Sequence, residues 1–327
     1  MNKELKYSQG ILEAYNYLLE NHKEFFVIGQ GLWSPWYVGA TMKDLDKKFG
    51  KRRVIDCPVS EYATTGAAVG ASIAGYKPMI VHPRIDFMLL AVDQIVSQAA
   101  KWRYMFGGNS SAPVTFRGII NRGGEQGAQH SQSLHSWFAH IPGLRVVMPY
   151  SAKDARDLMI ASVLCEDPVL FIDDRWLYDV QENYSKIELL DLKKIEPNII
   201  ENGKDITIVG IGHTVKLIMD SLNELKNNNI SCEVIDLRIL NPIDYTNIIN
   251  SVKKTGRLLV VDGDWSSCGM AGEIISSVVE KIEPSNLKSC PKRITLPDCP
   301  APTSKVLEDI YYINCKDIIS DVLSFFN

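Results

Sequence analysis

The sequence lacks several features that would place it in a specialised class of protein. Its 327 residues carry a net charge of −4, so no excess of basic residues indicates nucleic-acid binding. No apolar run reaches the roughly 20 residues that a membrane-spanning helix needs. The first ten residues also lack the apolar core of a secretory signal. We therefore expect a cytoplasmic protein that binds neither nucleic acid nor membrane.

The seven cysteines are scattered along the chain, odd in number, and include no C-x-x-C pair. This pattern argues against a zinc cage and against a disulfide framework. We expect reduced thiols and no metal site in this chain, because stable disulfides form mainly in oxidising compartments.

Two glycine-containing turns match cofactor-binding motifs only in part. Gly210 and Gly212 follow an apolar strand, but Val215 stands where a dinucleotide fingerprint has its third glycine. The string Asp262-Gly263-Asp264 resembles the start of a diphosphate–magnesium loop, yet no asparagine pair follows at the required distance. We interpret both as ordinary turns after strands.

Strand-like and helix-like segments alternate along the chain. Predicted strands lie at 25–28, 54–55, 79–82, 114–116, 145–148, 169–172, 206–211, 232–237, 258–261 and 294–295. Predicted helices include 9–21, 43–49, 87–104, 152–165, 215–227, 243–253, 272–282 and 316–326. The alternation predicts two three-layer α/β/α domains with mainly parallel sheets, at residues 1–185 and 204–327, joined by a polar linker at 186–203.

A single carboxylate, Glu61, stands between a short strand and a run of small residues. Residues 54–75 read V-I-D-C-P-V-S-E-Y-A-T-T-G-A-A-V-G-A-S-I-A-G. Gly66 and Gly70 share one face of the predicted helix, where another backbone could approach closely. We expect this helix to be too apolar for a solvent-exposed face. Apolar surroundings favour the neutral form of a carboxylate, which suits proton transfer near neutral pH. Glu61 is thus a catalytic candidate, with an N-cap or surface role as the alternative.

His130 is the second candidate. It follows Gly123, Gly124 and Gly127 on a loop after a predicted strand. Binding and catalytic residues concentrate on such loops, and imidazole titrates near neutral pH. The pattern predicts proton transfer or substrate binding, with a structural histidine as the alternative.

Long strings of the sequence resemble one family, the β subunits of thiamine-diphosphate-dependent 2-oxo-acid dehydrogenases and acetoin dehydrogenases in the transketolase superfamily. The strings are K-R-R-V-I-D-C-P-V-S-E, G-A-A-V-G-A-S-I-A-G-Y-K-P, D-Q-I-V-S-Q-A-A-K-W-R-Y-M-F-G-G and G-A-Q-H-S-Q-S-L-H-S-W-F-A-H-I-P-G-L-R-V-V-M-P. The likeness spans nearly the whole chain and is densest from 54 to 149. It implies a pyrimidine-binding domain followed by a transketolase C-terminal domain.

The resemblance also implies roles for individual residues. Glu61 falls on the catalytic glutamate, which hydrogen-bonds the aminopyrimidine of the cofactor and promotes its imino tautomer. Phe87 falls on the aromatic position that packs on the pyrimidine ring, and His130 falls on a histidine that faces the substrate. Gln30 lies in a cofactor-proximal turn where the family usually has Gly-Glu-Asp or Gly-Glu-Glu.

The resemblance further implies that this chain supplies half of each active site. In the family a separate α subunit holds the diphosphate and magnesium, so we expect an α2β2 heterotetramer with thiamine diphosphate shared at the α–β interface. The family also carries a structural potassium site, here near residues 165–167, and some members bind a lipoyl acyltransferase core. The sequence leaves both of these open.

One departure from the family pattern lies beside the expected site. His82-Pro83-Arg84-Ile85-Asp86 replaces the usual Met-Phe-x-Asp. Arginine suits the recognition of a carboxylate or phosphate, so His82 and Arg84 are candidates for substrate binding, with sequence drift in a surface loop as the alternative.

Three functions follow from these observations. The first is the β subunit of a 2-oxo-acid or acetoin dehydrogenase. The second is a subunit of a split transketolase-like enzyme, or of a thiamine-diphosphate-dependent acyl or ketol transferase acting on a sugar derivative. The third is a non-catalytic scaffold for an α subunit.

Overall fold

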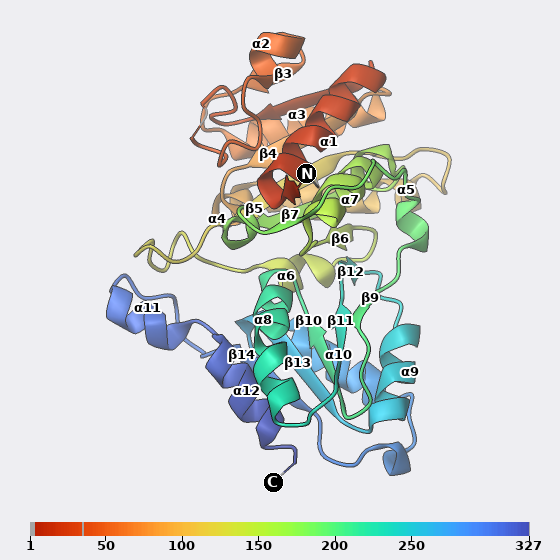
Figure 1. The fold of residues 1–327 in the computed structure, drawn as a ribbon. Coiled ribbons are helices and arrows are strands. Elements are labelled where there is room, and N and C mark those ends of the chain that lie inside the picture. Colours follow the sequence, from red (N-terminus) through yellow and green to blue (C-terminus); the bar gives the residue numbers. More distant parts are fainter. Residues whose placement is uncertain (1–3, 35, 327) are drawn as a thin grey trace. The chain divides into compact units, whose positions relative to one another are not determined.

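The computed structural model describes residues 4–34 and 36–326 and divides them into two compact units (Figure 1). The first unit contains the residues up to Asn121 together with Trp137–Ile195. The second unit contains Arg122–Ser136 and the chain from Glu196 onward. The sequence predicts the division near residue 195, but it does not show that residues 122–136 join the second unit.

The first unit begins with an alternation of helices and strands. Its elements are β1 (Glu4–Lys6), α1 (Tyr7–Asn21), β2 (Phe25–Gly29), α2 (Leu45–Phe49), β3 (Val54–Asp56), α3 (Glu61–Ile73), β4 (Lys77–His82), α4 (Ile85–Met88), η1 (Leu89–Ala91), η2 (Gln94–Ala99), α5 (Ala100–Met105), β5 (Thr115–Ile120), β6 (Arg145–Val147), α7 (Ala152–Leu164), β7 (Val169–Asp174), η3 (Arg175–Leu177), β8 (Gln181–Asn183) and η4 (Leu192–Lys194). The short helix α6 (His135–Ala139) spans the division between the units.

The large sheet of this unit is parallel, with its strands in the order β6-β7-β5-β4-β2-β3. Strands β5 and β7 are buried along their whole length, as expected for a parallel sheet covered on both faces. From β2 the chain moves outward to β3, and from β4 it moves outward in the opposite direction. The carboxyl ends of β2 and β4 therefore flank a topological switch point, where open α/β sheets form their binding crevice.

Helices α1 and α7 pack together over this sheet, and α3 packs with the segment from η1 to η2 (Figure 1). The close approach of α1 to α7 requires Gly10, because a Cβ there would collide with the carbonyl oxygen of Ala152. Ser151 caps α7 by accepting a hydrogen bond from the Asp154 amide at 3.1 Å, which satisfies a backbone donor that the helix leaves unpaired.

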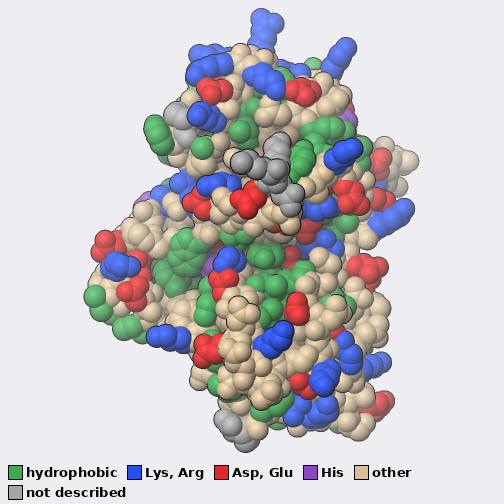
Figure 2. Space-filling view, in the orientation of Figure 1, with side chains coloured by type: hydrophobic (Ala, Val, Ile, Leu, Met, Phe, Trp, Pro, Cys, Tyr) green, Lys and Arg blue, Asp and Glu red, His purple; other side chains and the backbone are tan. Residues whose placement is uncertain are grey.

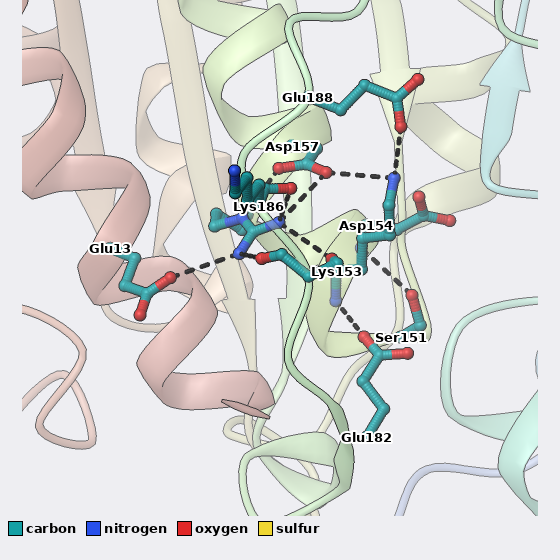
Figure 3. Close-up of polar contacts among 10 residues, drawn as sticks. Glu13, Ser151, Lys153, Asp154, Asp157, Glu182, Lys186 and Glu188 are labelled. Carbon is teal, nitrogen blue, oxygen red and sulfur yellow. Dashed lines mark hydrogen bonds and ion pairs between the residues drawn. The ribbon is translucent and has the colours of Figure 1, made fainter. Parts of the chain in front are cut away.

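A polar network at the start of α7 fastens two other segments to this helix (Figure 3). Arg156 Nε donates to Asp157 Oδ1 at 2.8 Å, and Arg156 Nη1 donates to Glu13 of α1 at 3.3 Å. Arg156 also donates to the carbonyl oxygen of Lys186 at 2.9 Å, and Lys153 donates to Glu188 at 2.8 Å. The first residues of the predicted linker are thus held against the first unit.

A second buried network joins the middle of β5 to the carboxyl end of β7. Arg117 and Asp173 are fully buried and form two parallel hydrogen bonds at 2.9 and 2.7 Å. Tyr178 donates to Asp173 at 2.6 Å, and Arg117 also donates to Thr41 at 3.0 Å. The network ties the long loop between β2 and α2 to the sheet, because buried charges persist only where they are paired.

The second unit is a smaller α/β domain. Its elements are β9 (Asn198–Glu201), β10 (Ile206–Gly210), α8 (His213–Asn227), β11 (Cys232–Asp236), β12 (Ile239–Asn241), α9 (Thr246–Thr255), β13 (Leu258–Trp265), α10 (Met270–Val279), η5 (Pro284–Asn286), β14 (Lys292–Leu296), α11 (Lys305–Tyr311) and α12 (Cys315–Leu323). Its sheet has the order β14-β13-β10-β11-β9, in which only the edge strand β9 runs antiparallel to its neighbour. The fold class predicted from the sequence is confirmed in both units.

The helix predicted over residues 87–104 is wrong in detail. The segment begins earlier, at α4, and passes through the 3₁₀ turn η1 and the π-helical stretch η2 before it ends in α5. The hydrophobic period indicates a helix but does not distinguish α from π hydrogen bonding, which depends on how the turns pack.

Helix α3 differs from expectation on its outer face. Its small residues pack inward only in part, because Ala63, Ala67 and Gly70 are exposed, as is the larger side chain of Tyr62. A Cβ placed on Gly70 would meet no atom within 4 Å. The expectation that this helix has no solvent-exposed face is therefore wrong for the single chain.

Charges of both signs are interspersed over the face of the molecule in Figure 2. Among residues 4–34 and 36–326, no helix combines the length and the apolar character needed to cross a membrane.

Candidate active site

A cleft lies at the switch point between β2 and β4. It encloses about 370 Å³ of space, part of which is open to solvent. The cleft brings together five of the six predicted site residues, and all five belong to the first unit: Gln30, Glu61, His82, Arg84 and Phe87. The sheet topology explains this grouping, because each of these residues lies at or just beyond the carboxyl end of β2, β3 or β4.

Glu61 is the first residue of α3 and is half-buried in the wall of the cleft. The preceding residue, Ser60, is the N-cap, and its side chain makes no cap hydrogen bond. Helix α3 contains two glycines and two threonines, which are weak helix formers, so its stability depends on packing rather than on intrinsic propensity. The carboxylate stands at the positive end of a 13-residue helix, where it can exchange a proton with a bound group.

His82 ends β4 and is 2% exposed. Its Nε2 lies 3.4 Å from the hydroxyl oxygen of Thr65 on α3. Burial lowers the pKa of His82 to about 4, because the charged form loses its hydration. His82 is thus neutral at pH 7 and offers the cleft a hydrogen-bonding ring without a positive charge.

Phe87 and Gln30 supply a flat ring and an amide to the same cleft. Phe87 lies on the short helix α4 and is 41% exposed, which is unusual for a phenylalanine with only a core role. Gln30 follows β2, and its Nε2 donates to the hydroxyl of Tyr37 at 3.0 Å. An exposed ring face, an amide and a carboxylate on one cleft fit a flat heterocycle that carries hydrogen-bonding groups.

Arg84 is the N-cap residue of α4 and is half-buried in the cleft wall. When the side-chain amide of Asn121 is turned so that its oxygen faces Arg84, Arg84 Nη1 and Nη2 donate to this oxygen at 2.9 and 3.2 Å. Burial lowers the pKa of Arg84, the nearby guanidinium of Arg175 lowers it further, and the carboxylate of Asp86 raises it.

Tyr37 lines the cleft and Arg175 contacts Tyr37, although the sequence did not reveal either residue. Tyr37 lines the cleft from the loop after β2, and Arg175 Nη2 donates to its carbonyl oxygen. The cluster of aromatic residues W-S-P-W-Y at 33–37 is a weak sequence signal for Tyr37. Arg175 directly follows β7. The sequence therefore predicts that Arg175 lies at the carboxyl edge of the sheet, but it does not predict which residues surround it.

His130 lies in the second unit and does not line this cleft. It is half-buried, and its backbone amide donates to Gly127 O at 3.3 Å. The loop that carries it is tied to α11 at two points, because the amide of Glu125 donates to Glu308 at 2.9 Å and the amide of Lys305 donates to Glu125 at 3.3 Å.

The same loop ends in a buried histidine that the sequence did not single out as a site. His135 Nε2 lies 2.9 Å from Asp262 Oδ1, and its Nδ1 lies 3.0 Å from the Ser133 hydroxyl. Burial lowers the pKa of His135, but the carboxylates of Asp262 and Asp264 together outweigh this and raise the pKa above its ordinary value. His135 is thereby fixed at the carboxyl end of β13.

The same loop also contacts the turn at Gly263 in the second unit. Arg122 Nη1 donates to Gly263 O at 2.9 Å, and a Cβ on Gly263 would lie 3.2 Å from a ring carbon of His213. Residues 122–136 thus contact β13 through Arg122 and His135.

No group of three or more histidine, cysteine, aspartate or glutamate side chains within the described part of the chain is arranged to hold a metal ion.

The fold and the cleft define a two-domain protein of the transketolase type. Residues 3–181 match the family "Transketolase, pyrimidine binding domain", and residues 196–318 match "Transketolase, C-terminal domain". The chain belongs to this family, and within it to the group that contains the β subunits of pyruvate and acetoin dehydrogenases, which confirms the resemblance inferred from the sequence.

Three relatives illustrate the group. The chain is 39% identical to the pyruvate dehydrogenase E1 component subunit beta of Rickettsia felis, over 91% of this chain and 90% of the relative. It is 36% identical to the mitochondrial counterpart of Bos taurus, over 92% and 85%. It is 38% identical to the acetoin:2,6-dichlorophenolindophenol oxidoreductase subunit beta of Bacillus subtilis, over 86% and 82%.

Solved structures show the same fold at lower identity. A split-gene transketolase, described as an inactive beta4 tetramer, matches with a TM-score of 0.78 at 18% identity, over 98% of this chain and 97% of that one. The transketolase of Campylobacter jejuni matches with a TM-score of 0.74 at 15% identity, over 99% of this chain and 47% of that one.

Proposed function

We propose that this chain is the β subunit of a thiamine-diphosphate-dependent dehydrogenase that acts on a 2-oxo acid or on acetoin. One observation carries the proposal: Glu61 and Phe87 share a cleft at the switch point of a pyrimidine-binding domain. The relatives named above are β subunits of dehydrogenases of this kind, and thiamine diphosphate is the cofactor that the family implies.

Each residue of the cleft has a distinct part in this proposal. Glu61 holds or releases a proton at a ring nitrogen of the cofactor, and Phe87 presents its ring face to the pyrimidine. Gln30 offers an amide to the same ring, while neutral His82 orients polar groups without adding charge. When bound, the cofactor supplies a carbanion nucleophile and an electron sink for the donor carbon. His130, which lies on the loop of the second unit, faces the substrate.

An α subunit is the expected partner, because relatives of this group are named as β subunits. The exposed outer face of α3 supports an α2β2 assembly with the cofactor at the interface. Ala63, Ala67 and Gly70 lie on this face and lack long side chains. Another subunit could therefore approach the backbone of α3 beside Glu61.

The finer parts of the assembly belong to the same proposal. The α subunit holds the diphosphate and magnesium, a structural potassium ion lies near residues 165–167, and a lipoyl acyltransferase core accepts the product. The location is cytoplasmic.

A second candidate function is acyl or ketol transfer to or from a sugar derivative by a split transketolase-like enzyme. The observation that favours it is Arg84 in the cleft wall, because a guanidinium suits an anionic or highly polar substrate better than a small keto acid. The likeness to the split-gene transketolase concerns the fold alone.

The test is the variant Glu61→Gln, reconstituted with the α subunit. We expect a loss of thiamine-diphosphate-dependent turnover of roughly 10²- to 10⁴-fold, the usual contribution of a proton-transferring group. Glu273→Gln is the matched control, because Glu273 also lies in the first turn of a helix, α10, and is exposed. It should retain turnover.

Unchanged turnover in Glu61→Gln would overturn the catalytic proposal and favour the scaffold alternative. Product analysis on the wild-type complex then separates the two enzymatic candidates: reduction of an electron acceptor marks a dehydrogenase, and a new carbon–carbon bond without redox change marks a transferase.

A further inference from the structure

Tyr37 presents a hydroxyl group to the candidate active site from the loop between β2 and α2. It lines the same cleft as Gln30 and Glu61, and its side chain is 42% exposed. The proposed function gives Tyr37 no part in the reaction. Its hydroxyl nevertheless lies within reach of any ligand that enters the cleft, so its hydrogen-bonding capacity decides which ligands fit there.

The ring of Tyr37 is held in place by its neighbours. Gly31 has a φ of +69°, and a Cβ on Gly31 would collide with the ring of Tyr37, so the ring packs directly on the backbone there. The amides of Gly31 and Leu32 donate to Asp56 Oδ1 at 2.6 and 3.3 Å, which ties this turn to the end of β3. The carbonyl oxygen of Tyr37 accepts from Arg175. A group that is fixed before a ligand arrives loses little conformational freedom on binding.

Tyr37 and Gln30 together present one donor and one acceptor. Gln30 Nε2 donates one of its two hydrogens to the hydroxyl oxygen of Tyr37 at 3.0 Å, and the other remains for the cofactor ring. Among residues 4–34 and 36–326, neither the hydroxyl proton of Tyr37 nor Gln30 Oε1 has a further hydrogen-bond partner. An alcohol hydroxyl satisfies both groups, because it accepts one hydrogen bond and donates another. A carbonyl or carboxylate oxygen only accepts, and it would leave Gln30 Oε1 unpaired.

We propose that Tyr37 and Gln30 form a recognition pair for an alcohol hydroxyl of the substrate, and that the pair selects a hydroxylated 2-oxo compound over the compound that lacks this hydroxyl. The inference rests on the proposed function for the type of reaction, whereas the pair itself rests on the hydrogen bond and the two free groups described above. The cleft encloses about 370 Å³ and also contains Glu61, so the recognised hydroxyl belongs to the same small molecule as the reacting carbonyl. A site built to hydrogen-bond a hydroxyl disfavours an analogue without it, because its own polar groups then stay unpaired.

The experiment compares two donors that differ by a single hydroxyl, hydroxypyruvate and pyruvate. Each is supplied to the complex reconstituted with the α subunit, thiamine diphosphate and magnesium, and turnover is followed by the reduction of an artificial electron acceptor. The measured quantity is the ratio of kcat/KM for hydroxypyruvate to kcat/KM for pyruvate. We expect a ratio of roughly ten or more in wild type, which corresponds to the net gain from one or two hydrogen bonds.

Tyr37→Phe removes only the hydroxyl and keeps the ring against Gly31. It should lower the ratio by roughly five- to tenfold, as expected for the loss of one hydrogen bond to the substrate. A residue that only supports the fold would instead change the turnover of both donors by the same factor. Tyr76→Phe is the matched control, because Tyr76 is 52% exposed in the same unit and lies outside the cleft. It should keep the wild-type ratio.

A binding measurement separates this proposal from the proposed function. Isothermal titration calorimetry gives the affinities of both compounds for the complex that carries Glu61→Gln, with and without Tyr37→Phe. If the wild-type complex turns over neither donor, but hydroxypyruvate binds more tightly than pyruvate only when Tyr37 is present, the proposed function fails and the recognition pair stands.

Two results would overturn the recognition pair. One is the absence of saturable hydroxypyruvate binding to the complex that carries Glu61→Gln. The other is an unchanged ratio between the two donors in Tyr37→Phe, in turnover or in affinity. Turnover of both donors with an unchanged ratio would leave the proposed function in place and remove Tyr37 and Gln30 as its specificity element.

Discussion

Acidification should destabilise this protein through His82 in a way that a single substitution can isolate. The side chain is 2% exposed, and burial lowers its pKa from 6.5 to about 4. In the unfolded chain His82 is hydrated and takes up a proton near pH 6.5. Between pH 6.5 and pH 4 the unfolded state therefore binds more protons than the folded state, and stability falls as the pH falls.

The size of the effect follows from the two pKa values. The pKa of His82 falls from 6.5 in the unfolded chain to about 4 in the folded chain. At 1.36 kcal/mol per pKa unit, this difference lowers the free energy of unfolding by about 3.4 kcal/mol once the pH is below both values. At pH 5 the unfolded chain is almost fully protonated at this position and the folded chain is not, so the loss relative to pH 7.5 is about 2 kcal/mol.

The assay compares wild type with His82→Gln, which keeps a neutral polar group near Thr65. Urea unfolding at pH 7.5 and pH 5.0 should show that the free energy of unfolding falls by about 2 kcal/mol more in wild type than in the variant over this interval. An NMR titration of the histidine ring protons provides the direct reading. The His82 resonance should not shift above pH 5.

His135→Gln is the control, because the contribution of His135 to stability changes with pH in the opposite direction. Asp262 raises the pKa of His135, so its contribution to stability is fully present below pH 6.5 and is lost as the pH rises through the folded pKa. When the pH falls from 7.5 to 5.0, the free energy of unfolding of wild type should therefore rise relative to that of His135→Gln. Equal pH slopes for wild type and His82→Gln, or a His82 resonance that titrates near pH 6.5, would refute the reasoning for His82.

Two further predictions concern the stability of the first unit. Asp173→Asn removes the charge that pairs with fully buried Arg117 and should lower the free energy of unfolding by about 3–5 kcal/mol, whereas Asp179→Asn breaks only a surface pair and should cost about 0–1 kcal/mol. Thermal and urea unfolding measure both, and similar losses would contradict the assignment. Gly10→Ala places a methyl group against the Ala152 carbonyl of α7 and should destabilise the chain by about 1–3 kcal/mol. Gly70→Ala places the same group in open space and should stabilise it by about 0.5–1 kcal/mol, so a loss in both variants would indicate a cause other than the contact between α1 and α7.

Local sequence patterns were sufficient for most of the individual elements. Strand β4 was predicted at 79–82 and spans Lys77–His82, and α8 was predicted at 215–227 and spans His213–Asn227. Strands β1, β8, β9 and β12 and helix α11 were missed, because short edge strands and single helical turns carry too little hydrophobic periodicity to stand out. The roles of Glu61, Phe87 and His130 remain predictions, and the Glu61→Gln experiment addresses the first of them.

The sequence by itself determined the two α/β domains, because the periods of strands and helices are local properties. Only the tertiary structure decided that Arg175 stands near Arg84, and that residues 122–136 join the second unit. Both depend on strand order and on pairing between residues far apart in the chain, such as His135 with Asp262. No local pattern predicts such distant pairing, because two buried polar groups pair only where the folded structure brings them together.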